Sequence, residues 1–231
     1  MDRLLEGKGL VRITLDDYAR ELGAFLAYDE ALNVKVLEND SDVERLLREA
    51  EEEVRRELTI ENLKSNSIIR AYRDFMWKIG IDPTKIRPAS EALIRRALRG
   101  NLPNINSLVD LGNAISIKYM VPIGIYDLNK IVSDLKLRRA REGEKFEPIG
   151  RGEVILKGNE LVLADDVGIL HLFPYRDSRR TMITLDTRNA LVVAAGVPGV
   201  DIDRVKGAVH EILKFLEGKG AKVSHDVYLA K

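Results

Sequence analysis

The stretch GEVILKGNELVLAD (Gly152–Asp165) marks the point at which helical patterns give way to strand patterns along the chain. Alternating apolar segments flank Gly158 and Asn159 in this stretch. Such a pair favours a tight turn between antiparallel strands, so the stretch predicts a β-hairpin. Further strands are expected nearby, at Leu135–Arg141, Val167–Phe173 and Ala190–Ala195.

Outside this β-rich region, apolar residues recur at the spacing of an α-helix in several segments. Trp77 is expected to pack with the apolar side of one helix, and Ser90 is expected to cap another that ends at Gly100. The predicted helices are Ser41–Leu58, Asn66–Ile79, Ser90–Arg99, one that ends at Pro122, and Arg204–Glu217. Two strands around a polar turn are expected at Gly9–Leu15 and Gly23–Val36, and a last strand at Lys222–Leu229.

The order of these patterns, helices first and strands later, favours an α+β fold over a doubly wound parallel sheet. A chain of 231 residues is long enough to bury one sizeable core. We therefore expect a single domain over residues 1–231.

Composition narrows the classes of function. The 37 basic and 37 acidic residues balance, so net charge does not indicate a nucleic-acid partner. Because the chain has no Cys, disulfides, thiolate nucleophiles and Cys-based metal sites are excluded, and we expect no metal and no other cofactor. No apolar run approaches the roughly 20 residues of a membrane helix, which predicts a cytoplasmic protein without a membrane partner. A charged fraction of 32% and the absence of Cys and Gln resemble heat-adapted proteins.

The sequence contains none of the common motifs of nucleotide-binding sites, serine hydrolases or zinc proteases. The three histidines are widely spaced. His210 is expected at the surface of a helix and His225 in a strand, which gives neither a catalytic role. His171, at the entry to an arginine-rich segment, stays open as a group that supports a site.

That arginine-rich segment is YRDSRRTMIT (Tyr175–Thr184). Arginine presents several fixed donors for phosphate or carboxylate, and the hydroxyls of Ser178 and Thr181 can position a water. The simpler interpretation from residue types alone is a salt-bridged turn in which Asp177 neutralises one arginine.

Four stretches taken together carry a family resemblance: Ile105–Ile131, Leu135–Phe146, Leu161–Gly168 and Asp186–Val197. Their order and spacing resemble the editing domain of the phenylalanyl-tRNA synthetase β subunit, also called its B-three/B-four or tRNA-binding domain. The resemblance covers residues 82–197, between strands and helices at 1–81 and a helix and strand at 198–231. Residues 68–106 look still more like free-standing relatives, and no length remains for a synthetase core.

The resemblance implies a three-layer α+β domain with a β-sandwich-like core, and a pocket that hydrolyses wrongly charged aminoacyl-tRNA. Such a second site removes errors that a single binding pocket cannot avoid. Its chemistry is ester hydrolysis by a held water, helped by donors around the developing oxyanion.

Three departures from the family pattern bear on this pocket. Gly124 stands where the synthetase pattern has a histidine implicated in editing, and Gly112-Asn113 replaces Thr-Asn. Pro174–Arg180 replaces a glycine-rich segment, so we expect a differently shaped and more basic pocket.

The resemblance places Arg176, Arg179 and Arg180 on the pocket segment, where they are expected to hold the terminal phosphate of tRNA or the substrate carbonyl. Ser178 and Thr181 would orient a water, with Asp177 as the third predicted catalytic residue. The facing wall is expected to comprise Asn106, Asp110 and Asn113. Arginines elsewhere would follow the tRNA backbone if they share a face, namely Arg95, Arg96, Arg99, Arg138, Arg139 and Arg141.

The leading interpretation is a deacylase that acts in trans on charged tRNA through a water rather than a protein nucleophile, with Ser178 as the residue to test against that. Two others stay open. One is a non-catalytic tRNA- or RNA-binding module. The other is a protein that reuses the pocket for a small carboxylate, since Arg pairs well with carboxylates.

Overall fold

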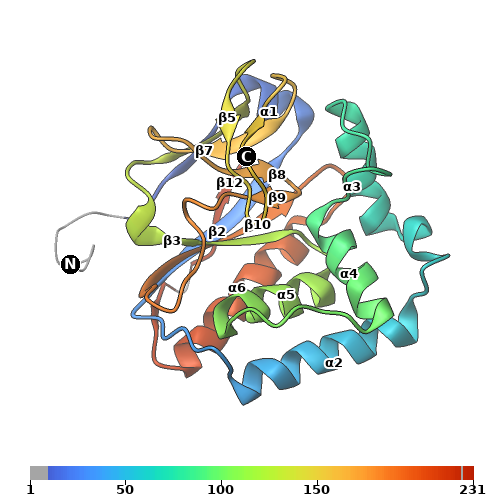
Figure 1. Ribbon diagram of the computed structural model, residues 1–231, viewed down its shortest axis with the longest axis vertical. Helices are drawn as coiled ribbons and strands as arrows, with labels where there is room; N and C mark the ends of the chain where they lie inside the picture. The colour runs from blue at the N-terminus through green and yellow to red at the C-terminus, as the bar shows by residue number, and fades with distance from the viewer. Residues whose placement is uncertain (1–9, 225) are drawn as a thin grey trace.

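The computed structural model describes residues 10–224 and 226–231 of the chain. In this part, two sheets face each other and helices cover the outer side of one of them (Figure 1). The predicted α+β class, with its three layers and β-sandwich-like core, is confirmed. His225 lies outside the described residues.

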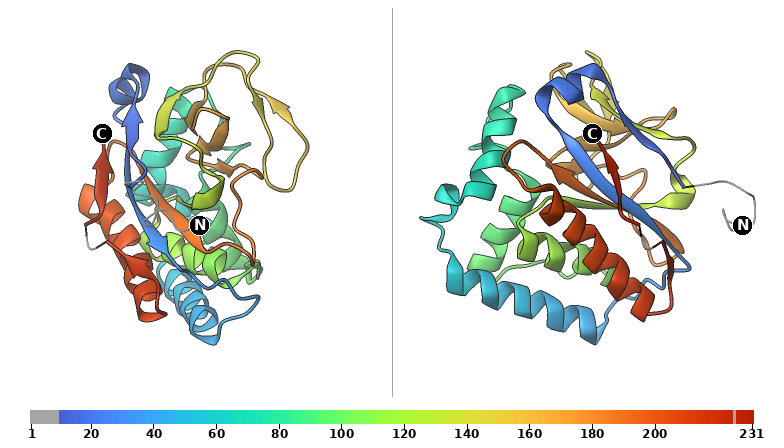
Figure 2. Two further views of the ribbon diagram at one scale, coloured as in Figure 1. Left: turned by 90° about the vertical axis from the view of Figure 1, so that its left-hand side faces the viewer. Right: turned by 180° about the vertical axis from the view of Figure 1, so that it is seen from behind.

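The central sheet has the strand order β11-β2-β10-β3, and β12 also pairs with β2. Its two long strands, β2 (Phe25–Leu32) and β10 (Asn189–Gly196), are antiparallel along their whole length. Nearly every residue in both strands is buried, because helices cover one face of the sheet and the other sheet covers the second face (Figure 2). The other members are β3 (Ile123–Asp127), β11 (Lys222–Val223) and β12 (Tyr228–Ala230).

The outer sheet has the order β1-β4-β7-β8-β9. Its bounds are Ile13–Leu15 for β1, Leu135–Arg139 for β4, Leu161–Ala164 for β7, Ile169–Phe173 for β8 and Arg176–Asp177 for β9. The β1–β4 pair is parallel and the remaining pairs are antiparallel. Strand β1, near the start of the chain, and strand β9, in the arginine-rich segment, therefore form the two edges of one sheet.

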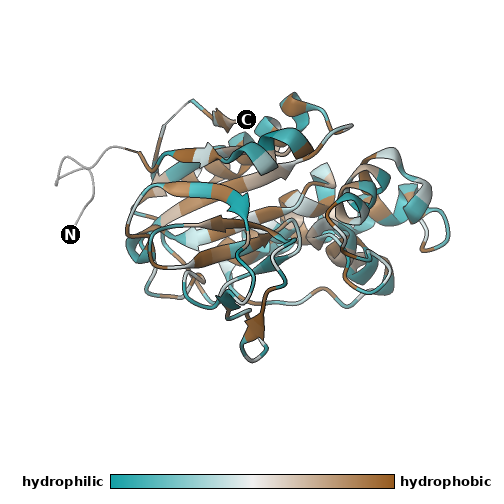
Figure 3. Ribbon diagram, turned by 90° about the horizontal axis from the view of Figure 1, so that it is seen from above, coloured by the Kyte–Doolittle hydropathy of each residue, from teal (hydrophilic) through white to brown (hydrophobic). Residues whose placement is uncertain are grey.

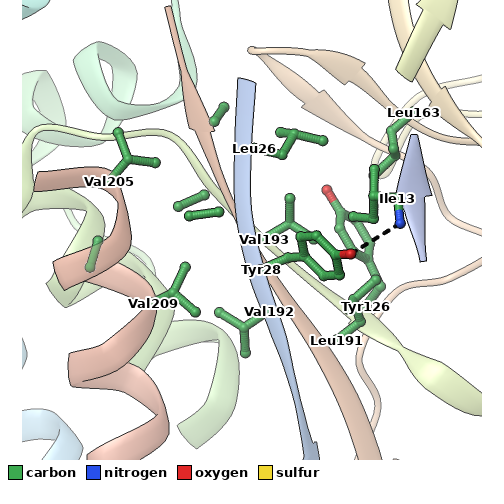
Figure 4. Packing of buried hydrophobic residues seen from close by; sticks show 14 of the residues in the cluster. Ile13, Leu26, Tyr28, Tyr126, Leu163, Leu191, Val192, Val193, Val205 and Val209 are labelled. Atoms are coloured by element: carbon green, nitrogen blue, oxygen red, sulfur yellow. Dashed lines mark hydrogen bonds between the residues drawn. The ribbon is translucent and has the colours of Figure 1, made fainter. Parts of the chain in front are cut away.

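Apolar side chains fill the space on both sides of the central sheet (Figure 4). Ile13 and Leu163 of the outer sheet approach from one side, and Val205 and Val209 of a helix approach from the other. The hydroxyl of Tyr28 accepts a hydrogen bond from the backbone N–H of Ile13 at 3.2 Å and so joins the two sheets. Coloured by hydropathy, the sheets are largely apolar, whereas the helices carry polar faces (Figure 3).

The helices are α1 (Asp17–Leu22), α2 (Ser41–Glu57), α3 (Ser67–Lys78), α4 (Ala89–Arg99), α5 (Ser107–Tyr119) and α6 (Ile202–Gly218). Two short 3-10 helices are η1 (Leu63–Ser65) and η2 (Leu128–Lys130). Helices α5 and α6 lie along the central sheet, and α2 crosses beneath them (Figure 1, Figure 2). No helix among the described residues is long and apolar enough to cross a membrane.

Two expectations about the helices were wrong. Ser90 does not cap α4, because Pro88 occupies that position and Ser90 is buried inside the first turn. Pro88 has a ψ of 143° and provides no side-chain hydrogen bond to the helix. Trp77 is 53% exposed rather than packed, because α3 turns Tyr72, Phe75 and Met76 inward instead.

The hairpin predicted at Gly158 and Asn159 was also wrong. The strand before the turn, β6 (Val154–Ile155), pairs with β5 (Lys145–Phe146), while β7 pairs with β4 and β8. The turn is stabilised by its own residues, because the carboxylate of Glu160 accepts hydrogen bonds from the backbone N–H groups of Lys157 and Gly158. The β5–β6 hairpin extends from the body of the protein (Figure 2).

The polar turn expected between the first two strands forms α1. Asp16 caps this helix by accepting the N–H of Ala19 at 2.8 Å, and Gly23 ends it with a φ of 73°. The helix sends β1 into the outer sheet and β2 into the central sheet. The last strand is similarly divided into β11 and β12.

Candidate functional site

A narrow pocket opens where the two sheets approach the start of α4. Its walls come from β3 and β10 of the central sheet and from β8, β9 and the turn between them. The lining residues are Ala89, Pro122, Ile123, Gly124, Tyr126, His171, Leu172, Pro174, Tyr175, Arg176, Asp177, Val193 and Ala195. The cavity volume is about 20 Å³. That is room for about one water molecule, which needs roughly 10–15 Å³.

Tyr126 fills the space above Gly124. The two residues are separated by one position on β3, so they face the same side of the strand. A methyl group added at Gly124 would lie only 1.9 Å from the Tyr126 hydroxyl oxygen. Glycine at 124 is therefore what allows this tyrosine to lie in the pocket.

The Tyr126 hydroxyl joins two further pocket residues into a polar chain, which we call the Asp–Tyr–His chain. Its oxygen lies 2.9 Å from Oδ1 of Asp177 and 2.5 Å from Nδ1 of His171. His171 and Asp177 are paired across β8 and β9, which brings both side chains to Tyr126. Tyr126 and His171 are almost completely buried.

Burial shifts the pKa of every member of the Asp–Tyr–His chain. Desolvation lowers the pKa of His171 to about 3, so its ring is neutral at physiological pH. Desolvation raises the pKa of Asp177 to about 6, although the Tyr126 hydrogen bond and the Arg176 charge oppose this rise. The pKa of Tyr126 is raised well above its ordinary value by burial and by Asp177.

The three arginines of the segment have different environments. Arg180 is held by the Asp165 carboxylate at 2.8 Å and by the backbone oxygens of Lys130 and Gly168. Arg179 is exposed, and Arg176 is half-buried at the pocket. Among the described residues, no hydrogen bond or ion pair engages the guanidinium of Arg176. Of the three, only Arg176 combines a pocket position with free donors.

A model of the B3/4 domain family matches residues 71–212, well over half of the chain. The chain belongs to this family. The phenylalanine–tRNA ligase β subunit of Neisseria meningitidis serogroup B is 34% identical to it over 101 residues, which make up 44% of this chain and 13% of that protein. The β subunit from Fusobacterium nucleatum is 28% identical over 115 residues, or 50% and 14% of the two chains. The resemblance expected from the sequence is confirmed.

A solved structure supports the fold of this B3/4 domain. An N-terminal fragment of the phenylalanyl-tRNA synthetase β subunit from Pyrococcus horikoshii superposes with a TM-score of 0.50 at 17% identity. The match covers 92% of this chain and 50% of that fragment. The curated relatives are much longer, because the matched part of this chain spans about one seventh of their length.

Two predicted water-orienting residues of the B3/4 domain, Ser178 and Thr181, do not line the pocket. Ser178 lies next to Asp177 on the opposite side of the extended segment, and its Oγ accepts the N–H of Arg180 at 3.1 Å. Thr181 is completely buried, and its hydroxyl has no partner among the described residues. Both side chains are buried, and Thr181 lies in the turn that follows the extended segment.

The predicted facing wall, formed by Asn106, Asp110 and Asn113, is also not part of this pocket. Asn106 caps α5 by accepting the N–H of Val109 at 3.0 Å. The Asp110 carboxylate accepts the N–H of Ile105 and a hydrogen bond from Asn113. These polar residues organise the start of α5, which explains why they interrupt an apolar sequence.

Replacing Asn106 with alanine should therefore destabilise the protein without altering pocket chemistry. Loss of an N-cap costs about 1 kcal/mol in the free energy of unfolding. Urea denaturation of Asn106→Ala would measure the loss, and Asn106→Ser, which keeps a capping oxygen, should recover most of it. If Asn106→Ala were as stable as the wild type but hydrolysed substrate at a different rate, Asn106 would have to be part of the functional site.

Several of the arginines predicted to follow the tRNA backbone are engaged within the protein. Arg95 binds the fully buried carboxylate of Glu91 at 2.8 Å, and Arg138 binds Glu144 through two hydrogen bonds. Arg139 donates to the backbone oxygen of Gly158 and lies over the ring of Tyr18. The exposed residues Arg96 and Arg99, at the end of α4, have no ion pair among the described residues.

Sequence reasoning left His171 open and did not identify Tyr126. Gly124 and Tyr126 are two positions apart, which would have been a signal for a large side chain above a glycine had a strand been predicted there, but none was. The pairing of His171 with Asp177 depends on the turn between β8 and β9 and had no comparable local signal.

Proposed function

We propose that this B3/4 domain hydrolyses the ester bond of wrongly charged aminoacyl-tRNA in trans. The observation that carries the proposal is the free guanidinium of Arg176 beside the Asp–Tyr–His chain in a pocket that has room for one water. Its relatives are named as β subunits of phenylalanine–tRNA ligase, which supports charged tRNA as the substrate.

Ester hydrolysis requires a positioned water and a donor for the oxyanion that forms at the carbonyl. We assign the donor role to Arg176, because its guanidinium is positively charged and has no hydrogen bond or ion pair among the described residues. A low-dielectric wall of Ile123, Val193 and Ala195 would strengthen that interaction. Ser178, already engaged with Arg180, is assigned to holding the segment in place.

Incubation of the protein with a panel of correctly and wrongly charged tRNAs, each carrying a labelled amino acid, tests the proposal. We expect catalytic release from a wrongly charged class of tRNA. Release must exceed the spontaneous hydrolysis measured without protein. No release from any member, with tRNA binding retained, would overturn the proposal.

The structure does not favour a pure tRNA-binding module. Four of the arginines expected to contact nucleic acid, Arg95, Arg138, Arg139 and Arg180, are already engaged by carboxylates or backbone oxygens. Phosphate contacts require donors that are free to leave their intramolecular partners. We assign tRNA contacts to Arg96, Arg99 and Arg179, whose guanidinium groups have no hydrogen bond or ion pair within the described part of the chain.

The rate of deacylation should rise with pH through about 6. Tyr126 on β3 donates a hydrogen bond to Asp177, His171 on β8 is its cross-strand neighbour, and the charge of Arg176 acts on it from the preceding position of β9. Because the folded pKa of Asp177 is raised to about 6, its carboxylate form is present above that pH and is lost below it. A pH–rate profile from 5 to 8, corrected for spontaneous hydrolysis, checks this expectation. The Asp177→Asn variant should lack the inflection near pH 6. A wild-type profile without that inflection would show that the ionisation of Asp177 does not control the rate.

A further inference from the structure

The positions of protons in the Asp–Tyr–His chain follow from its geometry. The Tyr126 hydroxyl has one proton but two neighbours within hydrogen-bond distance, Oδ1 of Asp177 and Nδ1 of His171. An ionised carboxylate can only accept a hydrogen bond, so the Tyr126 hydroxyl donates its proton to the hydrogen bond with Asp177. The tyrosine oxygen must then accept a hydrogen bond from Nδ1, which places the proton of the neutral imidazole on Nδ1.

This arrangement leaves Nε2 of His171 with a free lone pair. Nε2 is buried and has no hydrogen-bond partner among the described residues, although His171 lines the pocket. Buried polar atoms are generally paired with protein or with an ordered water. A pocket that has room for about one water, beside an unpaired acceptor, fits a water held by Nε2.

We infer that His171 is the general base that holds and deprotonates the attacking water, with Tyr126 coupling its ring to the charge of Asp177. This inference rests on the proposed function. The water oxygen forms a bond to the ester carbonyl carbon while one water proton moves to Nε2. When the bond from that carbon to the ribose oxygen breaks, the same proton passes from Nε2 to the ribose oxygen. The imidazole returns to its neutral form, and no cofactor is consumed.

Protonation of Asp177 also changes His171, through the hydrogen bonds of the Asp–Tyr–His chain. With Asp177 protonated, the carboxyl donates to Tyr126, and Tyr126 in turn donates to Nδ1. The neutral imidazole then carries its proton on Nε2, which becomes a donor and can no longer accept from water. One proton bound at Asp177 therefore removes the lone pair at the other end of the chain.

Nitrogen-15 NMR of the imidazole rings reads this arrangement directly and does not depend on activity. The sequence has three histidines, so a His171→Gln variant assigns the signal. At pH 8 we expect the neutral tautomer with the proton on Nδ1. In Tyr126→Phe, which keeps the ring but loses the hydroxyl, we expect the proton to move to Nε2. A proton on Nε2 in the wild-type protein at pH 8, or a charged ring, would contradict the proton positions inferred for the Asp–Tyr–His chain.

Kinetics complete the test. Removal of a general base costs about 10²–10⁴-fold in rate, so His171→Gln should lower kcat by at least about 100-fold with little change in KM. Tyr126→Phe should also lower kcat while His171 remains in place. A fully active His171→Gln protein would overturn the role of His171 and leave the deacylase proposal standing. If NMR finds the Nδ1 tautomer but no charged tRNA releases its amino acid, both catalytic proposals are overturned. Only the hydrogen-bond arrangement of the Asp–Tyr–His chain would then stand.

Discussion

The Arg176→Ala variant should release amino acid from charged tRNA roughly 10²–10³-fold more slowly than the wild-type protein, as expected for loss of one oxyanion donor. The guanidinium lies at the pocket and has no hydrogen bond or ion pair among the described residues, so its removal breaks no such contact. The loss should therefore appear in kcat rather than in protein stability.

The matched control for Arg176→Ala is Arg179→Ala. Arg179 is three residues away on the same segment and is exposed rather than part of the pocket lining. Its replacement should weaken tRNA binding modestly, with an effect that fades at high salt, and should leave kcat nearly unchanged. Equal losses of kcat in both variants would show that the segment acts only as a basic surface. A rise in KM alone for Arg176→Ala would assign that residue to phosphate instead of the carbonyl.

The second large effect is expected from Gly124→Ala. The added methyl group would lie 1.9 Å from the hydroxyl oxygen of Tyr126 and 2.5 Å from its ring. The ring cannot stay in place, so His171 and Asp177 would lose their shared partner inside the protein. Overpacking costs about 1–3 kcal/mol and each unpaired buried polar group about 1–3 kcal/mol more. We expect a loss of about 3–5 kcal/mol in the free energy of unfolding.

Urea denaturation with a double-mutant cycle separates the clash from a general intolerance of alanine. In the Tyr126→Ala background, where the hydroxyl and ring are gone, Gly124→Ala should cost much less than in the wild type. The control is Gly218→Ala, at the end of α6, where nothing lies within 4 Å of an added methyl group. If Gly124→Ala were as stable as the wild type, the close packing of Tyr126 over Gly124 would be refuted.

Where structure depends on neighbours along the chain, sequence patterns predicted it well. Helix α2 forms within one residue of its predicted end, because its cap at Asp40 and its apolar spacing are local signals. The strand expected at Ala190–Ala195 lies within β10 for a similar reason, since its unbroken apolar run suits burial on both faces. Order and spacing of longer stretches were enough to indicate the B3/4 domain family.

Strand partners were less predictable. Gly158 and Asn159 do turn the chain, yet the strands on either side pair with β5, β4 and β8 instead of with each other. Turn residues specify a local backbone shape, whereas pairing depends on which apolar faces are buried together. A correct local signal therefore produced the wrong hairpin.

The sequence by itself determined the α+β class, the family and the arginine-rich segment as the place to look for chemistry. Only the tertiary structure decided which polar residues act together. It engaged Arg180 with Asp165, left Arg176 at the pocket without a hydrogen bond or ion pair to the described residues, and brought Tyr126, His171 and Asp177 together from three strands. The physical reason is that hydrogen bonds and desolvation depend on distances across the fold, and His171 is 45 residues from Tyr126 along the chain.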